Sequence, residues 1–336
     1  MENTINKTSL FFLICLQYLF SPTLSQFSLP CNDEDKQILL QVKKEFRNPS
    51  LFSTWNANTD CCNSWRFVSC NNDLRLGRVS SLSFDNVNEI TGQIPPTIGN
   101  LTYLKVLRFS RLPNLIGPIP ETITRLPDLE VFTITQNKKL SGSMPNFSDQ
   151  MKSVGTIELY SNSFTGTIPS SLSLVPNLFR LDLSSNKLTG SIPVSFGSFK
   201  RNVDLKLMNN KLSGTIPRSL AQADLLGLDV SGNQFTGDVS FILGGTRLND
   251  FIIRQNHFKF DFTNVRLSQN LGIIDIAHNE IYGSIPKEIG QLPVLQTIDF
   301  SYNQLCGPIP SSLKQFNSSA FAHNKCLCGA PLPPCK

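Results

Sequence analysis

Eight of the nine cysteines could form disulfides or bind a metal ion, and they fall into two groups near the ends of the chain. The first group is Cys31, Cys61, Cys62 and Cys70. The second group is Cys306, Cys326, Cys328 and Cys335. Zinc ligand pairs are usually separated by about two to four residues, whereas a single residue separates Cys326 from Cys328. An even number of cysteines in an exported chain is typical of disulfides. We therefore expect disulfides, no metal site and no cofactor.

Catalysis would require a nucleophile beside a base, or paired carboxyl groups in an enclosed site. The three histidines are His257, His278 and His323. His278 is expected near Asp275, but no serine or cysteine nucleophile accompanies it. Acidic residues recur, yet on a sheet that we expect to be open to water, where no pocket would raise a carboxyl pKa. We therefore expect a protein that is not an enzyme and has no catalytic residues.

A repeat in the middle of the chain must position any functional side chain. The segment NxLxGxIP recurs, and its glycine marks the repeats at Gly92, Gly117, Gly142, Gly166, Gly190, Gly214, Gly237, Gly283 and Gly307. The interval between Gly237 and Gly283 is twice the usual one, and Phe260 stands at the missing marker. Each repeat carries LxxLxLxxN before the marker. This period and spacing define the leucine-rich repeat.

The repeats predict an α/β solenoid, a leucine-rich-repeat right-handed superhelix of about ten 24-residue repeats. One repeat cannot bury its own leucines, whereas stacked coils bury them in a continuous core. The alternating xLxLx part of each repeat is a short strand, and parallel stacking of these strands makes a concave β-sheet. Disulfide-bonded N- and C-terminal caps are expected because a bare end coil would expose core leucines.

The start of the chain predicts export. Lys7 precedes an apolar run over 10–20, and the small residues Thr23 and Ser25 follow that run. The run is too short to span a bilayer, so we expect a cleaved signal peptide, a secreted chain and no membrane anchor. A helix is expected over 32–48 within the first cap. The expected segments are a signal peptide at 1–25, an N-terminal cysteine cap at 26–78, ten repeats at 79–310 and a C-terminal cysteine cap at 311–336.

One asparagine follows the strand of each repeat. The column is Asn137, Asn162, Asn186, Asn210, Asn233, Asn256, Asn279 and Asn303. An exposed column could serve as a flat ice-binding or ligand ladder. The interpretation that we favour is structural: each side chain turns inward and satisfies backbone groups at the strand end.

Both caps carry specific motifs. The first reads CNDEDKQILLQVKKEFRNP and then STWNANTDCCNSWRFVSC, and the tail reads LCGPIP and then SAFAHNKCLCGAPLPPC. With ten LxGxIP-type repeats between these caps, the chain resembles the plant polygalacturonase-inhibiting proteins over essentially its whole mature length. The paired Cys61–Cys62, Trp55, Trp65 and the CLCG tail are more specific than the LxGxIP repeat, which receptor ectodomains share.

The resemblance implies a protein of the plant cell wall or apoplast. It implies binding of endo-polygalacturonases of fungi and insects by the concave face, which blocks pectin breakdown, and a second sheet on the flank around LxGxI. It also implies the disulfides Cys31–Cys61, Cys62–Cys70, Cys306–Cys326 and Cys328–Cys335. The chain departs from the pattern at Phe67, where the cap often has glycine, and at Asp238-Val239 and Asp261-Phe262, which replace the Ile-Pro step in two repeats.

Residues between the inward-facing leucines lie on the concave side. One column of such residues is Ser83, Arg108, Thr133, Glu158, Asp182, Lys206, Asp229, Ile252, Asp275 and Asp299. Its acidic members could meet a basic surface, because an enzyme that binds a polyanion must present Lys and Arg around its cleft. Alternatively, the LDLS form of the repeat places aspartate there whatever the partner. Both interpretations stay open at this point.

The next concave column contains Tyr160 and Met208, two large apolar groups in the middle of the face. Aromatic and arginine residues are frequent interface anchors. We expect the side chains of Tyr160 and Asp182 to point to solvent. The expected partner-binding residues are Gln136, Glu158, Tyr160, Arg180, Asp182, Lys206, Met208 and Asn209.

The formal net charge is +5, and Lys and Arg are scattered along the chain. Nucleic-acid binders usually cluster these residues on one face, so we expect no nucleic acid and, as a further partner, the polyanion of pectin, homogalacturonan. Glycans are expected on the sequons at Asn100, Asn146 and Asn317, away from the strands. We expect a monomer.

Three functions are compatible with these features. The leading one is a secreted inhibitor of microbial, chiefly fungal, endo-polygalacturonases that acts by occlusion in plant defence. The second is a non-inhibitory leucine-rich-repeat interaction protein in receptor signalling or development. The third is an ice-binding relative. The concave columns are irregular in size and charge, which favours a protein partner over a crystal lattice, but the residues do not decide between the first two functions.

Overall fold

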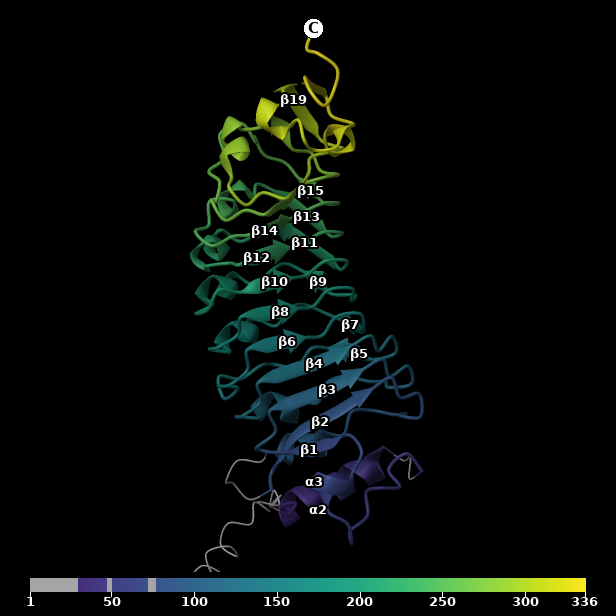
Figure 1. The fold of residues 1–336 in the computed structure, drawn as a ribbon. Coiled ribbons are helices and arrows are strands. Elements are labelled where there is room, and N and C mark those ends of the chain that lie inside the picture. The colour runs from purple at the N-terminus through teal and green to yellow at the C-terminus, as the bar shows by residue number, and fades with distance from the viewer. Residues whose placement is uncertain (1–29, 47–49, 72–76) are drawn as a thin grey trace, which may run out of the picture.

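The computed structural model describes residues 30–46, 50–71 and 77–336, and the expected signal peptide at 1–25 lies outside them. Figure 1 shows short coils stacked into an elongated body, with the helices α2 (Asp33–Glu45) and α3 (Cys61–Ser64) at one end and the C-terminus at the other. Among the described residues, no helix is both long and apolar enough to cross a membrane.

The largest sheet has eleven strands in the order β1-β2-β3-β4-β6-β8-β10-β12-β14-β16-β18. β1 (Val68–Cys70) pairs antiparallel with β2 (Val79–Asp85), and every later pair is parallel. The register aligns the buried residues, so that Leu181 pairs with Ile157 on one side and Leu205 on the other. The later strands are β3 (Val106–Ser110), β4 (Val131–Thr135), β6 (Thr156–Glu158), β8 (Arg180–Asp182), β10 (Asp204–Lys206), β12 (Gly227–Asp229), β14 (Asp250–Ile252), β16 (Ile273–Asp275) and β18 (Thr297–Asp299). The predicted leucine-rich-repeat solenoid with a parallel sheet is confirmed.

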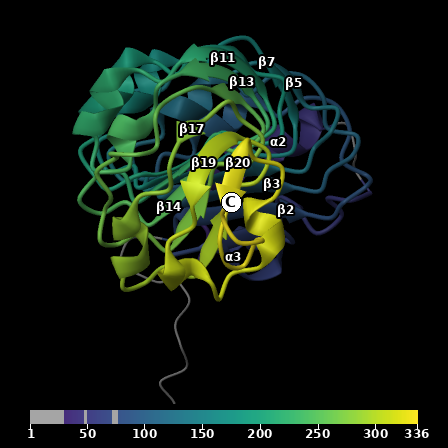
Figure 2. The same ribbon diagram turned by 90° about the horizontal axis from the view of Figure 1, so that it is seen from above.

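A second set of strands lies on the flank, where the resemblance implies a sheet, but it is divided into three pieces. Figure 2, which looks along the stack, shows β5, β7, β11 and β13 on one side of the coils and β2, β3 and β14 on another. The first piece pairs β5 (Ser141–Ser143) with β7 (Ser163–Thr165). The other strands are β9 (Thr189–Gly190), β11 (Lys211–Thr215), β13 (Gln234–Gly237) and β15 (His257–Phe258) in the second piece, and β17 (Tyr282–Gly283), β19 (Gln304–Pro308) and β20 (Cys326–Cys328) in the third.

Short 3-10 helices return the chain toward the next strand. In most coils the helix begins directly after the proline of the Ile-Pro step and buries one apolar residue, as Pro169 and Leu172 do. Proline suits this place because its φ is already that of the first helical turn. The helices are η1 (Pro96–Asn100), η2 (Glu121–Arg125), η3 (Ser170–Leu174), η4 (Val194–Ser198), η5 (Arg218–Gln222), η6 (Ser240–Ile242), η7 (Lys287–Gln291), η8 (Ser311–Leu313) and η9 (Ser318–Phe321).

The expected helix of the N-terminal cap is present as α2, which ends at Glu45. Its N-cap residue Asn32 accepts hydrogen bonds from the backbone N–H groups of Glu34 and Asp35. Acidic residues in the first turn and basic residues in the last turn complement the helix dipole. The helix packs over the first coil, where Phe46 contacts the rings of Phe84 and Phe109.

The asparagine column is turned inward, as we favoured. In one example, the side-chain amide of Asn137 donates to the carbonyl of Phe109 at 2.9 Å, and its carbonyl oxygen accepts from the N–H of Leu112 at 2.8 Å. Equivalent bonds to the preceding coil recur in the following coils and continue into the C-terminal cap at Asn324. An outward-facing ladder built on these asparagines is therefore excluded.

Four disulfides close the two caps. They join the pairs that the resemblance implies: Cys31–Cys61, Cys62–Cys70, Cys306–Cys326 and Cys328–Cys335. The sulfur atoms of Cys31, Cys61 and Cys62 lie within 4.8 Å of one another. Because these three sulfurs are all in disulfides, the group offers no thiolate for a metal ion.

The structure shows how Phe67 is accommodated where the family pattern often has glycine. Its φ is 71°, in the left-handed region that favours glycine. Any other residue costs about 1–2 kcal/mol in this conformation. The phenyl ring packs against Phe84, with ring centroids 4.9 Å apart, and the guanidinium of Arg66 lies over the ring, 4.9 Å from its centroid. The ring contacts offset the backbone cost.

Candidate partner-binding surface

The register of the large sheet places the predicted column in one line across the concave face. Each member lies beside the next on the neighbouring strand, as Glu158 lies beside Asp182 and Asp182 beside Lys206. A second line runs two residues earlier in each strand and contains Arg180 and Asp204. Side chains two apart in a strand share a face, so both lines face the concave side.

Four charged residues form a continuous network in the middle of this face. Arg180 donates from Nε to Glu158 at 2.9 Å and from Nη1 to Asp204 at 3.0 Å. The ammonium group of Lys206 lies 3.6 Å from the same carboxylate of Asp204. All four side chains are partly exposed. We call Glu158, Arg180, Asp204 and Lys206 the charged network; it crosses β6, β8 and β10.

Apolar and amide side chains flank the charged network. Tyr160 and Met208 are half-buried, and Gln136 and Asn209 are exposed. Gln136 and Asn209 both have a positive φ at the turn that follows the strand, which directs the chain out of the sheet. Gln136, Glu158 and Tyr160 also line a hollow of about 320 Å³. The structure thus brings seven of the eight predicted residues together as accessible groups on neighbouring strands.

Asp182 is the exception, and the expectation that it points to solvent is wrong. Its residue is only 8% exposed, and its carboxylate accepts a hydrogen bond from the N–H of Ser184 at 3.0 Å. Asp229, Asp275 and Asp299 hold the N–H two residues later in the same way. Aspartate therefore stabilises the strand end in this form of the repeat, which supports the structural interpretation of these four residues.

Three concave carboxyl groups have a raised pKa, although the sheet is open. Burial raises the pKa of Asp275 to about 6, and the neighbouring carboxylate of Asp299 adds to the effect. Burial also raises the pKa of Asp182 and of Asp250, and in Asp250 the charge of Asp204 contributes. The expectation that nothing on this face would raise a carboxyl pKa is therefore wrong, because neighbouring side chains desolvate these groups without forming a closed pocket.

The raised pKa of Asp275 predicts a pH-dependent stability. The unfolded carboxyl group ionises near 3.8 and the folded one near 6, so ionisation disfavours the folded state progressively across that interval. The melting temperature of the wild type relative to Asp275→Asn should fall as pH rises from about 4 to about 6, and then level off. Thermal melts of both proteins across this pH range measure the difference.

Asp261→Asn is a control for which we expect the opposite dependence of stability on pH. Hydrogen bonds from Thr263 lower the pKa of Asp261, so this carboxylate stabilises the fold above its ordinary pKa and the contribution is lost at lower pH. A difference between wild type and Asp275→Asn that does not change with pH would contradict the assignment.

Sequence reasoning missed two kinds of residue on this face. The first is Asp204, which completes the charged network. Asp204 occupies in its repeat the position that Arg180 occupies in the preceding one, so the repeat alignment could have placed it beside Arg180. The second is an exposed stack in which the ring of Tyr302 lies between His278 and His323, with centroids 4.1 Å apart on both sides. These three residues occupy the same left-handed position in successive coils. No sequence signal beyond the repeat register indicates the stack.

The three sequons lie off all described strands. Asn100 ends η1, Asn146 lies in a loop, and Asn317 is the N-cap residue of η9. All three are exposed. Their glycosylation stays a prediction.

Family profiles match three segments of the chain. The profile for the leucine rich repeat N-terminal domain matches residues 32–71. The profile for the leucine rich repeat matches residues 177–199 and 294–316.

Full-length relatives are similar to the whole chain. A polygalacturonase inhibitor of Pyrus communis is 44% identical, over 96% of this chain and 98% of its own length. Leucine-rich repeat protein FLOR 1 of Arabidopsis thaliana is also 44% identical, over 97% of this chain and 98% of its own length. Among solved structures, a plant ice-binding protein superposes with a TM-score of 0.85 at 42% identity, over 91% of this chain and 99% of its own.

Proposed function

This chain belongs to the polygalacturonase-inhibitor family of leucine-rich-repeat proteins, and we propose that it binds and inhibits microbial, chiefly fungal, endo-polygalacturonases through its concave face. The observation that carries the proposal is full-length similarity to proteins named polygalacturonase inhibitor, such as that of Pyrus communis. We propose that this activity takes place outside the cell, in the plant cell wall or apoplast, where the disulfide-bonded caps would be stable. Defence against pectin breakdown is the corresponding role.

The geometry supports inhibition by occlusion. The charged network and the half-buried Tyr160 and Met208 form one accessible surface across neighbouring strands. An enzyme that binds a polyanion presents basic groups around its cleft, and Glu158 and Asp204 offer carboxylates to such a rim. Apolar side chains beside the charges would be desolvated in the complex and would slow its dissociation.

The decisive experiment measures inhibition directly. The purified protein is added to a panel of fungal endo-polygalacturonases with polygalacturonate as substrate, and released reducing ends are measured. We expect a saturable loss of activity for at least some of the enzymes. An absence of inhibition across a broad panel would overturn the proposal and leave a binding role in signalling or development.

Tyr160→Ala should weaken inhibition of a susceptible enzyme by about tenfold, because a partly buried aromatic side chain in the centre of an interface is a typical anchor. The measurement is the apparent inhibition constant. Tyr282→Ala is the matched control, since Tyr282 is an exposed tyrosine on the flank strand β17. Equal inhibition constants for the two variants would remove Tyr160 from the interface.

Ice binding is the second candidate, and the similarity to a plant ice-binding protein favours it. The inward asparagine column cannot contact ice, and the concave columns vary in size and charge between neighbouring strands. Ice-crystal shaping by the purified protein at low temperature, measured beside the inhibition assay, distinguishes the two candidates.

We also propose that the protein adheres to homogalacturonan, because it carries a net charge of +5 and the polymer is a polyanion. Exposed Lys and Arg side chains would supply this attraction, which salt screens. Retention on immobilised pectate at low salt is the corresponding measurement. We propose a monomer for both activities.

A further inference from the structure

The row of 3-10 helices has a gap between η2 and η3 and another between η6 and η7, and the second gap lies in the C-terminal third of the chain. In the coil after β13, the buried Val239 occupies the place of the isoleucine and Ser240 that of the proline, so the expected replacement of Ile-Pro by Asp238-Val239 is displaced by one residue. The helix η6 in this coil is only three residues long. In the next coil, the buried Phe262 and then Thr263 stand at the same place, one residue later than the expected Asp261-Phe262, and no 3-10 helix forms between η6 and η7. Both coils also lack the proline that precedes the five-residue helices η3 and η4.

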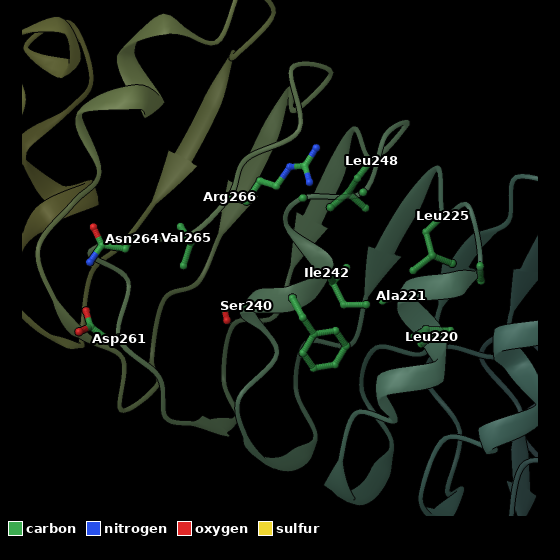
Figure 3. A pocket seen from close by; sticks show the side chains of 14 residues that line it. Leu220, Ala221, Leu225, Ser240, Ile242, Leu248, Asp261, Asn264, Val265 and Arg266 are labelled. Carbon is green, nitrogen blue, oxygen red and sulfur yellow. The ribbon is translucent and has the colours of Figure 1, made fainter.

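A cavity of about 460 Å³ lies at this interruption, on the side of the coils that carries the 3-10 helices. Figure 3 shows Ile242, Leu225 and Leu248 on the wall formed by η6 and the adjoining coils, with Val265 on the next coil. The volume is in the range of small-molecule sites, about 300–1,000 Å³. The middle of the cavity is therefore suited to a compact apolar group.

The two ends of the cavity differ in charge. Figure 3 shows the side chain of Arg266 extending toward Leu248, whereas Asp261 and Asn264 lie together at the far end. The stem of Arg266 passes close to Gly244, where an added Cβ would stand 3.1 Å from Cδ of the arginine. Hydrogen bonds from Thr263 lower the pKa of Asp261 and keep its carboxylate charged.

Arg266 differs from the other arginines of this region. Arg218 pairs with Asp238 at 4.0 Å, and Arg247 pairs with Asp224 at 3.0 Å. Within the described part of the chain, the guanidinium of Arg266 has no carboxylate within 4.0 Å. A guanidinium at the rim of an apolar cavity matches a carboxylate in charge and in hydrogen-bonding geometry.

We propose that this cavity binds a small amphipathic carboxylate with an aromatic or compact apolar body. The ligand's carboxylate pairs with Arg266, and its body lies between Ile242 and Val265. A hydroxyl group at the opposite end of the ligand donates to Asp261, which also repels the carboxylate and thereby sets the orientation. This site does not use the large concave sheet and goes beyond the proposed inhibition.

The test uses para-coumarate as the probe, because it has an aromatic body, a carboxylate at one end and a phenolic hydroxyl at the other. Binding to the full-length secreted protein is measured by isothermal titration calorimetry. Two further probes each remove one polar group: para-coumaryl alcohol lacks the carboxylate, and cinnamate lacks the phenol. We expect the wild type to bind para-coumarate saturably and more tightly than either.

Three variants locate the site. Arg266→Gln should weaken para-coumarate binding by about tenfold and leave the binding of para-coumaryl alcohol unchanged. Arg247→Gln, an exposed arginine outside the cavity lining, should change neither. Ala221→Trp places an indole at the mouth of the cavity from an exposed position on η5 and should abolish binding of all three probes.

Several results would overturn the proposal. The first is an absence of saturable para-coumarate binding to the wild type. The second is an affinity of Arg266→Gln for para-coumarate that equals that of the wild type or that of Arg247→Gln. The third is para-coumarate binding by Ala221→Trp with the wild-type affinity. Circular dichroism melts of each variant confirm that it is folded before titration. None of these outcomes depends on inhibition of a polygalacturonase.

Discussion

Asp35→Ala should lower the free energy of unfolding by about 3–5 kcal/mol, because it breaks a buried ion pair that two hydrogen bonds hold together. The residue is 1% exposed, and its carboxylate accepts two hydrogen bonds from Arg78, at 2.7 and 2.9 Å. It also accepts from the N–H of Val79 at 2.8 Å. One side chain therefore joins the cap helix α2 to the first strand of the repeats. Its loss leaves the N–H of Val79 without its acceptor and leaves Arg78 with the longer ion pair to the exposed Glu34, at 3.6 Å.

Urea unfolding followed by circular dichroism measures this loss. Glu130→Ala is the matched control, since Glu130 forms an exposed ion pair with Lys105 at 3.2 Å, and such pairs contribute about 0–1 kcal/mol. If Asp35→Ala does not fold, the double variant Asp35→Leu with Arg78→Met should recover part of the stability, because an apolar pair leaves no buried charge. Unfolding of Asp35→Ala at the same urea concentration as the wild type would contradict the role of this pair.

The repetitive parts of the structure could be predicted because every repeat forms the same local backbone structure with the same buried positions. An LxLxL strand buries alternate residues, and an asparagine after it meets the same backbone groups in every coil, as Asn137 does. Asp35 and Arg78 could not be paired from the sequence. Their contact depends on how the cap helix packs on the first coil. The repeats give no information on this packing, because the cap is not itself a repeat.

The concave site shows the same limit. The repeat period correctly aligns Glu158, Asp182 and Lys206 on one face. It does not reveal that Asp182 is covered by its neighbours and bound to Ser184, because burial depends on the lengths of the side chains on both adjoining strands. Similarly, Phe262-Thr263 is visible as a departure from Ile-Pro, but the cavity beside it depends on how the short helix η6 packs beside the next coil, which has no 3-10 helix.

Glu158→Lys should weaken inhibition of a susceptible polygalacturonase by about a hundredfold, or about 2.8 kcal/mol. Glu158 differs from Asp182, Asp229, Asp275 and Asp299, whose carboxylates are held by backbone N–H groups. Its carboxylate pairs with Nε of the partly exposed Arg180 and can exchange that partner for a basic group of the enzyme. A lysine at this position would stand beside Arg180 and face the same basic rim.

Glu280→Lys makes the same change of charge at a control position. Glu280 is also partly exposed and pairs with a basic residue, Lys259, at 3.9 Å, but it precedes the flank strand β17 and lies outside the concave columns. Inhibition constants of both variants are measured at low and at high salt. The deficit of Glu158→Lys should shrink at high salt, because added ions screen the repulsion between exposed charges. If both variants inhibit equally well, or if the deficit is independent of salt, the carboxylate of Glu158 does not meet a basic surface, and the apolar side chains of Tyr160 and Met208 must account for recognition on this part of the face.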